Sequence, residues 1–235
     1  METIFNCKAK KIDQNTGREE LTNLYGQAFD EGRQNGYTPV FVVVNDVLEE
    51  TIEEQFGSVG SAEEYVKSVL SENHSNGKEI FEHRYSYIVE EYGDGLEYID
   101  RNMLDEMLPM PENEQSTIMP SVSDYEGDLY LVQIPTLNPY EIFAWLPFGG
   151  WNECPDTDDM IAMCKYWYES YGAVPMIITY DTLTFKLDEP ITDIESALNA
   201  AKEQLAFCED IADYADIEEL ISMTYNNHYW SFWWD

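Results

Sequence analysis

Basic residues are scarce in this chain, in which 12 Lys and Arg stand against 47 Asp and Glu, so that the formal net charge of the 235 residues is −35 at pH 7. Between residues 85 and 164 there are seventeen acids and one cation, Arg101, and no Lys or Arg follows Lys202. A field this negative repels nucleic acid and anionic membranes, and we expect no direct binding to either. It favours a basic protein, a metal cation, or a partner whose natural ligand is DNA or RNA.

Cysteine is also sparse, and long apolar runs are missing. The four cysteines have no regular spacing and no C-x-x-C pair: Cys7, Cys154, Cys164 and Cys208. No stretch approaches the roughly eighteen consecutive apolar residues of a membrane-spanning helix. The segment from Met1 to Asp13 has no apolar run typical of a signal peptide. These absences predict a cytoplasmic protein with reduced thiols.

Motifs of established chemistry are missing too. The sequence has no Walker loop, no G-x-G-x-x-G, no G-x-S-x-G and no kinase signature. The histidines His74, His83 and His228 lack the spacing of a zinc site, and no D-x-D-x-D-G calcium loop occurs. Cys208 lies in helical phase with Leu205, which predicts a small buried residue and not a nucleophile. The sequence therefore identifies no catalytic residue, no metal ligand and no cofactor.

The composition predicts a folded protein, because 44% hydrophobic and 14% aromatic residues are too many for a disordered acidic tail. Four possible N-cap residues are followed three positions later by Glu, which predicts helix starts at Thr16, Ser61, Thr192 and Asp216. A further helix is predicted over residues 157–171, where apolar side chains recur at helical spacing.

Several apolar segments predict strands. The continuous run from Val40 to Val44 suits a central strand covered on both faces, and residues 129–134 and 176–180 are similar. Apolar and polar residues alternate from 183 to 187, which predicts a half-exposed strand after a tight hairpin at Asp181. Together these elements predict an α/β or α+β fold, with a central mixed sheet flanked by helices and two connected halves.

Two segments repeat the same order of signals. In each, a glycine ends a helix (Gly36, Gly172), a proline begins an apolar strand, and an acidic turn follows (45–48, 180–183). This repeat favours two related α/β halves.

A polar stretch that contains several prolines separates these halves. We predict an N-terminal α/β half at residues 1–110, a linker at 111–127 and a C-terminal α/β domain at 128–235. The C-terminal domain contains most of the aromatic motifs described next.

The chain ends in an aromatic run with the pattern W-x-F-W-W-D, from Trp230 to Asp235. In a strand, Trp230, Phe232 and Trp234 would share one face while Trp233 points to the other. Each Trp can bury a large apolar area, which predicts a core strand that seals the domain. The functional alternative is an aromatic-lined pocket or an interface anchor.

This ending is preceded by a Y-G-A segment from Tyr171 and by an F-C-x-D segment from Phe207. The three motifs in this order resemble the bacterial family named domain of unknown function 4253, over about residues 138–235. The resemblance implies an intracellular bacterial α/β domain and implies no activity.

Six residues are candidates for a binding site: Trp151, Asp156, Asp158, Asp159, Asp210 and His228. The acids belong to dense clusters that a basic partner or a cation would contact. Their structural alternative is a helix cap together with a solvated face, because acids at a helix start favour its dipole.

Three interpretations of function remain open. The first is a non-enzymatic binding protein that inhibits a basic partner, as an immunity protein inhibits a nuclease toxin or a nucleic-acid mimic inhibits a DNA-binding enzyme. The second is an enzyme of unrecognised type, with a pocket near Trp151, Asp210 and His228 in which a group has a strongly shifted pKa. The third is a domain of unknown function whose charge serves only solubility.

Overall fold

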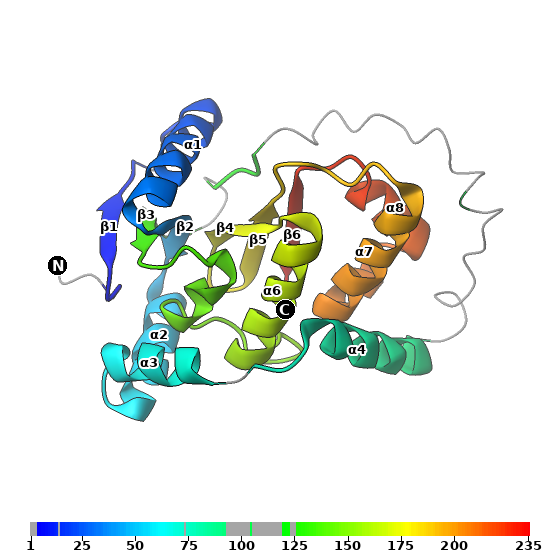
Figure 1. Cartoon of the computed structure of the whole chain (residues 1–235), viewed down its shortest axis with the longest axis horizontal. Helices are drawn as coiled ribbons and strands as arrows, with labels where there is room; N and C mark the ends of the chain where they lie inside the picture. The colour runs from blue at the N-terminus through cyan, green and yellow to red at the C-terminus, as the bar shows by residue number, and fades with distance from the viewer. Residues whose placement is uncertain (1–3, 14, 73, 93–103, 105–118, 123–125) are drawn as a thin grey trace.

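One six-stranded sheet organises the chain (Figure 1). The computed structural model describes these residues: 4–13, 15–72, 74–92, 104, 119–122 and 126–235. The strands are β1 (Lys8–Lys11), β2 (Thr38–Val44), β3 (Asp128–Ile134), β4 (Val174–Ile178), β5 (Thr182–Lys186) and β6 (Tyr229–Trp233). The α-helices are α1 (Arg18–Asn35), α2 (Asp46–Val59), α3 (Ala62–Ser71), α4 (Gly77–Tyr92), α6 (Thr157–Tyr171), α7 (Ile194–Phe207) and α8 (Ile217–Thr224). Two 3-10 helices are η1 (Pro139–Ala144) and η2 (Glu209–Asp213).

The strand order in the sheet is β1-β3-β2-β4-β5-β6. β2 and β4 are parallel, and the remaining neighbours are antiparallel. This mixed sheet with helices on its faces confirms the predicted fold class and makes it α/β. β3 follows the predicted linker, yet it lies between β1 and β2, so both predicted halves contribute to one sheet. The linker itself, residues 111–127, lies largely outside the described residues.

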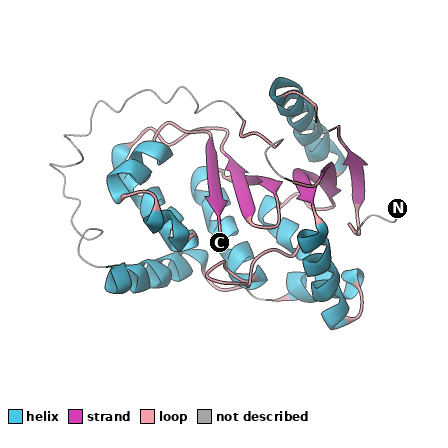
Figure 2. Cartoon of the chain, turned by 180° about the vertical axis from the view of Figure 1, so that it is seen from behind, coloured by secondary structure: helices cyan, strands magenta, loops and turns pink. Residues whose placement is uncertain are grey.

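Helices cover the two faces of the sheet unequally. Along β2, Val40 and Val42 point to one face and Phe41 and Val43 to the other, and all four side chains are buried. The first face packs against α2, α3, α4, α6, α7 and α8, whereas α1 packs on the second face over β2, β3 and β4 (Figure 2). β2 is therefore the central strand that its apolar run predicted. None of the described helices is long and apolar enough to cross a membrane.

The sequence predicted two helix starts correctly and two incorrectly. Ser61 caps α3 and Asp216 caps α8, each by accepting a backbone hydrogen bond. Thr192 lies one residue before the true cap of α7, which is Asp193, and Thr16 precedes a glycine that begins α1 without a side-chain cap. Neighbouring residues that can all cap a helix are not distinguished by residue type alone.

The structure differs from the sequence predictions at three further points. The acidic turn at 45–48 is the start of α2, because Asn45 Oδ1 accepts a hydrogen bond from Leu48 N at 2.9 Å. The repeat also differs in its helices, since α1 and α6 lie on opposite faces of the sheet. β5 follows the predicted hairpin, but it is not half-exposed, because Thr182 and Thr184 are buried with their apolar neighbours.

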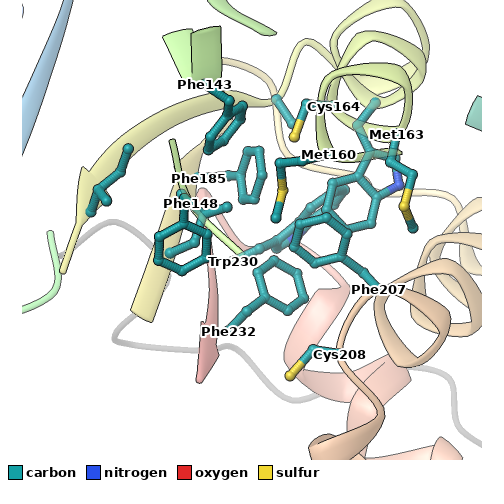
Figure 3. Close-up of a cluster of buried hydrophobic side chains, with 14 of the residues drawn as sticks. Phe143, Phe148, Met160, Met163, Cys164, Phe185, Phe207, Cys208, Trp230 and Phe232 are labelled. Carbon is teal, nitrogen blue, oxygen red and sulfur yellow. The ribbon is translucent and has the colours of Figure 1, made fainter. Parts of the chain in front are cut away.

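An aromatic cluster fills the space between the sheet and the helices (Figure 3). Trp167 of α6 lies at its centre, with ring centroids 4.7 Å from Phe207 of α7 and 5.5 Å from Phe232 of β6. The three side chains predicted to share one face of the last strand are buried, while Trp233 is 45% exposed. The C-terminal run is therefore a core strand, as predicted.

Candidate functional site

A hollow of about 470 Å³ lies between α4, the loop before α6 and the start of η2. We name it the acidic hollow. Its acidic and basic lining residues are Glu79, His83, Arg84, Glu153, Asp159 and Glu209. Four of these are acids and one, Arg84, is a permanent cation, so the hollow concentrates the negative charge of the chain.

One wall of the acidic hollow is a side of α4. Glu79, His83 and Tyr87 recur every fourth residue and therefore face the same way. Gly77 lets the start of α4 approach α6 closely, because a Cβ atom at this position would lie 2.1 Å from the carbonyl oxygen of Ala162. The close packing of α4 on α6 thus depends on a glycine.

Arg84 joins this wall to the other elements of the hollow. Its Nε donates a hydrogen bond to the carbonyl oxygen of Ala206 at 2.7 Å, and its Nη2 donates to the carbonyl oxygen of Glu153. One guanidinium therefore links α4, the end of α7 and the loop before α6. Its charge also lowers the pKa of Asp159, against other effects that raise it. The sequence analysis missed Arg84 because it predicted no helix over residues 77–92.

The start of α6 presents three of the predicted acids. Asp156 is the N-cap of α6 and accepts hydrogen bonds from the backbone N–H groups of Asp158 at 3.1 Å and Asp159 at 3.0 Å. The structural alternative thus explains Asp156. Asp159 lines the hollow, and its pKa is raised, first by burial and then by the charge of Asp156.

Asp158 contacts two residues of the segment between α3 and α4, Glu72 and His74. It hydrogen-bonds to Glu72, and this bond and the charge of Asp158 raise the pKa of Glu72. Asp158 Oδ1 also lies 3.6 Å from Nδ1 of His74. Two carboxyl groups in direct contact share a proton more readily than isolated ones, because two like charges repel each other at this distance.

Asp210 lies where the C-terminus meets η2. Its Oδ2 accepts a hydrogen bond from the backbone N–H of Asp235 at 3.3 Å, and Asn152 donates to the carbonyl oxygen of Asp235. Burial raises the pKa of Asp210 most, and nearby carboxylates, Glu153 among them, raise it further. Trp151 is half-buried in the same loop as Asn152, with its ring packed on the core.

These contacts connect the acids into one surface, which we name the acidic face. Its members are Glu72, Glu153, Asp156, Asp158, Asp159, Glu209, Asp210 and Asp235. His228 is not part of it, because it precedes β6 while Asp235 follows the other end of that strand. The Nδ1 atom of His228 is hydrogen-bonded to the carbonyl oxygen of Leu187 at 2.9 Å. The structure therefore groups the four predicted acids and places Trp151 in the adjoining loop, while His228 lies apart.

The chemistry of the acidic face is that of cation recognition. Its carboxylates can accept hydrogen bonds from guanidinium and ammonium groups. Within the described part of the chain, no group of three His, Cys, Asp or Glu side chains is placed to hold a metal ion. The acidic face therefore presents negative charge that is spread over several carboxylates. The hydrogen bonds of Arg84 to Ala206 and Glu153 hold the elements beside it together.

The comparisons with known proteins concern the C-terminal part of the chain. No curated protein and no solved structure matches the sequence significantly. The family match covers α6, α7, η2 and β4 to β6 but not α4, so the acidic hollow lies where the matched part meets the preceding segment. Residues 130–235 match the family described as Domain of unknown function (DUF4253), the family that the aromatic motifs predicted.

Proposed function

We propose that this chain is a non-enzymatic binding protein of the cytoplasm that docks a basic protein on its acidic face. The partner would be a nuclease or another nucleic-acid-binding protein, whose basic cleft the acidic face would occupy as an immunity protein or a nucleic-acid mimic does. The protein would then act as an inhibitor, since an occupied cleft cannot bind its nucleic acid.

The observation that carries this proposal is the crowding of carboxylates on the acidic face. The pKa values of Glu72, Asp159 and Asp210 are all raised, and neighbouring carboxylates contribute to each shift. Such crowding destabilises the free protein, because like charges at short distance repel. A partner that brings positive charge removes the repulsion, so part of the binding energy comes from the relief of this strain.

The acidic hollow also has the shape for an anchoring side chain. Its acids are accompanied by Ile80, Ile88 and the 56% exposed ring of Tyr87. A partner arginine would place its apolar stem and its guanidinium plane against such surfaces, with the charge towards the carboxylates. We expect this arginine to be a hot spot of the complex.

The test is a pair of triple variants with equal changes of charge. The partner is captured on the immobilised full chain at low ionic strength, eluted with salt, purified, and titrated by calorimetry. We expect Asp158→Asn, Asp159→Asn and Asp210→Asn together to raise Kd by at least about thirtyfold, because each removes a charged hydrogen-bond acceptor. We expect Glu49→Gln, Glu50→Gln and Glu53→Gln, three exposed acids of α2, to change Kd far less.

Equal losses in the two triple variants would mean that only net charge matters, and this would contradict the docking site. The absence of any basic protein in the salt eluate would favour the interpretation that the acidity serves solubility. A complex whose Kd does not change with ionic strength would contradict the proposal too, since screening weakens charge-driven association.

A further inference from the structure

A second hollow, of about 350 Å³, lies on the other side of α4, where this helix meets α6 and α7. We name it the lysine hollow. The residues that define its character are Lys78, Tyr85, Tyr166, Tyr171, Lys202 and Glu203. Figure 1 shows α4 beneath α6 and α7, the two helices that complete the walls.

Glu203 is held in place by aromatic donors. Its Oε1 accepts a hydrogen bond from the hydroxyl of Tyr166 at 3.0 Å, and its Oε2 accepts one from Nε1 of Trp167 at 2.9 Å. A third bond comes from Tyr171. The carboxylate is thus a fixed structural acceptor, and much of its capacity for hydrogen bonds is already used.

Lys202 of α7 contacts an aromatic ring of α4. Its Nζ lies 5.6 Å from the ring centroid of Tyr85, and it forms no ion pair with any carboxylate of the described residues. The side chain is only half-exposed. A lysine that lines a hollow and forms no ion pair among the described residues can donate hydrogen bonds to an anion.

The charge of the lysine hollow supports the same conclusion. Lys78 and Lys202 balance Glu82 and Glu203, the two acids of its lining, and Lys78 is paired with Glu82, with 3.7 Å between Nζ and Oε1. The acidic hollow, in contrast, has four acids and one cation. A small anion that enters the lysine hollow therefore meets a lining whose formal charges cancel, in which Lys202 is the lysine without an ion pair in the described part of the chain.

From this arrangement we propose that the lysine hollow binds a small aromatic anion, that is, a ring that carries a phosphate or a carboxylate. The anionic group contacts Lys202 and Lys78, and the ring packs against the tyrosine walls. Aromatic walls with a carboxylate also suit organic cations. Here, however, Glu203 is already bonded to Tyr166 and Trp167, and a cationic ligand would add a third positive charge beside the two lysines.

The test uses the full chain and three probes of similar size: phenyl phosphate, benzoate and phenyltrimethylammonium. Binding is followed by calorimetry and by the indole N–H resonance of Trp167, which reports on Glu203 of the lining through their hydrogen bond. We expect one or both anions to bind and to shift this resonance, and the cation to do neither. We expect Lys202→Gln to weaken anion binding by about tenfold or more, the effect of one lost charged hydrogen bond.

Two variants provide the controls. Lys202→Arg keeps the charge and should retain binding, whereas Lys165→Gln removes another lysine that lies over a tyrosine ring, 5.9 Å from Tyr140, outside the hollow. Lys165→Gln should leave the affinity unchanged. The proposal is overturned if the cation binds better than both anions, if no probe binds, or if the two glutamine variants have equal effects. None of these outcomes bears on the acidic face, which is tested with a protein partner.

Discussion

The two sides of α4 line hollows of different charge, one with an excess of acids and one in which the charges balance. One side contributes Glu79 and Arg84 to the acidic hollow, and the other contributes Lys78 and Glu82 to the lysine hollow. Successive residues of a helix are rotated by about 100°, so Lys78 and Glu79 are neighbours in sequence and face different hollows. Helical periodicity alone separates the two sites.

This difference shows the limit of an argument from net charge. The net charge of −35 agrees with the local charge of the acidic face, because the carboxylates of this face outnumber the cations near them. It does not describe the lysine hollow, where two of the twelve basic residues lie together. The placement of a few cations decides local chemistry even in a chain this acidic.

The helices that line both hollows pack on the aromatic core. Substitutions in that core should therefore lower the free energy of unfolding more than any others. Trp234 is fully buried, and its ring centroid lies 5.4 Å from that of Phe207, which also packs against Phe81 of α4. We expect Trp234→Ala to lower the free energy of unfolding by about 3 to 5 kcal/mol. Deletion of residues 231–235 should abolish cooperative unfolding, as measured by calorimetry or near-ultraviolet circular dichroism.

The control for this prediction is the preceding tryptophan, Trp233, which is the last residue of β6. Trp233 is 45% exposed and donates one hydrogen bond, from Nε1 to Asp181 at 3.0 Å. Trp233→Ala should therefore cost about 1 kcal/mol or less. Equal losses for Trp233→Ala and Trp234→Ala in denaturant unfolding would contradict the role of β6 as a core strand.

Arg84→Met tests the acidic side of α4 alone. The variant removes the donor to the carbonyl oxygens of Ala206 and Glu153, and with it the one Lys or Arg that lines the acidic hollow among the described residues. We expect a loss of about 1 to 3 kcal/mol in denaturant unfolding, which Arg84→Lys restores only in part, since an ammonium lacks the planar set of donors. The control is Arg33→Met, which removes an exposed ion pair with Asp188 at 4.0 Å and should change the free energy of unfolding little. A similar loss of stability in Arg33→Met and Arg84→Met would contradict the role of Arg84 in joining the elements of the hollow.

Glu203→Ala gives the corresponding test on the lysine side. The variant leaves the indole N–H of the buried Trp167 without its acceptor, and we expect a loss of about 1 to 3 kcal/mol in the free energy of unfolding. Glu203→Gln keeps an acceptor oxygen and should recover part of this loss. If Glu203→Ala is as stable as the unchanged protein, then Tyr166 and Trp167 donate to water in place of the carboxylate, and the expectation is contradicted.

Much of the fold could be predicted from the sequence, and the failures have physical causes. The apolar runs at β2, β3 and β4 and the aromatic period of β6 lie in the core, where burial dictates residue type. α4 was missed because it packs against α6 and α7 while its other side faces a hollow, so polar and apolar residues alternate around it. Its contacts are set by tertiary structure, which local patterns do not encode.

The candidate site shows the same division. The acid clusters were visible in the sequence, because Asp156, Asp158 and Asp159 stand together at a predicted helix start. Their neighbours Arg84 and Glu72 come from segments more than seventy residues earlier, and only the folded chain brings them close. The pairing of Lys202 with Tyr85 has the same origin. The sequence thus identified which residues could form the site, whereas their contacts with Arg84, Glu72 and Tyr85 follow only from the tertiary structure.

The crowded carboxylates predict a smaller effect, a gain of stability on mild acidification. In the folded state the pKa values of Asp159 and Asp210 are raised above the ordinary 3.8. Between the ordinary and the raised pKa the folded state holds more protons than the unfolded state, so stability falls as pH rises through this window. We expect Tm to rise as the pH is lowered from neutral into this window.

Asn variants separate this effect from the general charge of the chain. Asp159→Asn and Asp210→Asn should each raise stability at neutral pH, by less than about 1 kcal/mol because both groups are largely solvated, and should reduce the dependence of Tm on pH. Glu49→Gln removes the same charge from an exposed position of α2, outside the acidic face, and serves as the control. A loss of stability in both Asn variants would contradict the repulsion on the acidic face.

Alkylation of the cysteines should have the smallest effect in the native protein, since no cysteine lines either hollow among the described residues. Cys154, Cys164 and Cys208 are buried, and burial raises their pKa values. For Cys208 the pKa is raised to about 12, and its Sγ donates a hydrogen bond to the carbonyl oxygen of Trp233 at 3.0 Å. Because only the thiolate reacts readily, these three thiols should resist alkylation at neutral pH in the native protein and react once it is unfolded in denaturant. Mass spectrometry that finds rapid native labelling of Cys208 would show a reactive thiol near the C-terminus and reopen the search for a nucleophile there.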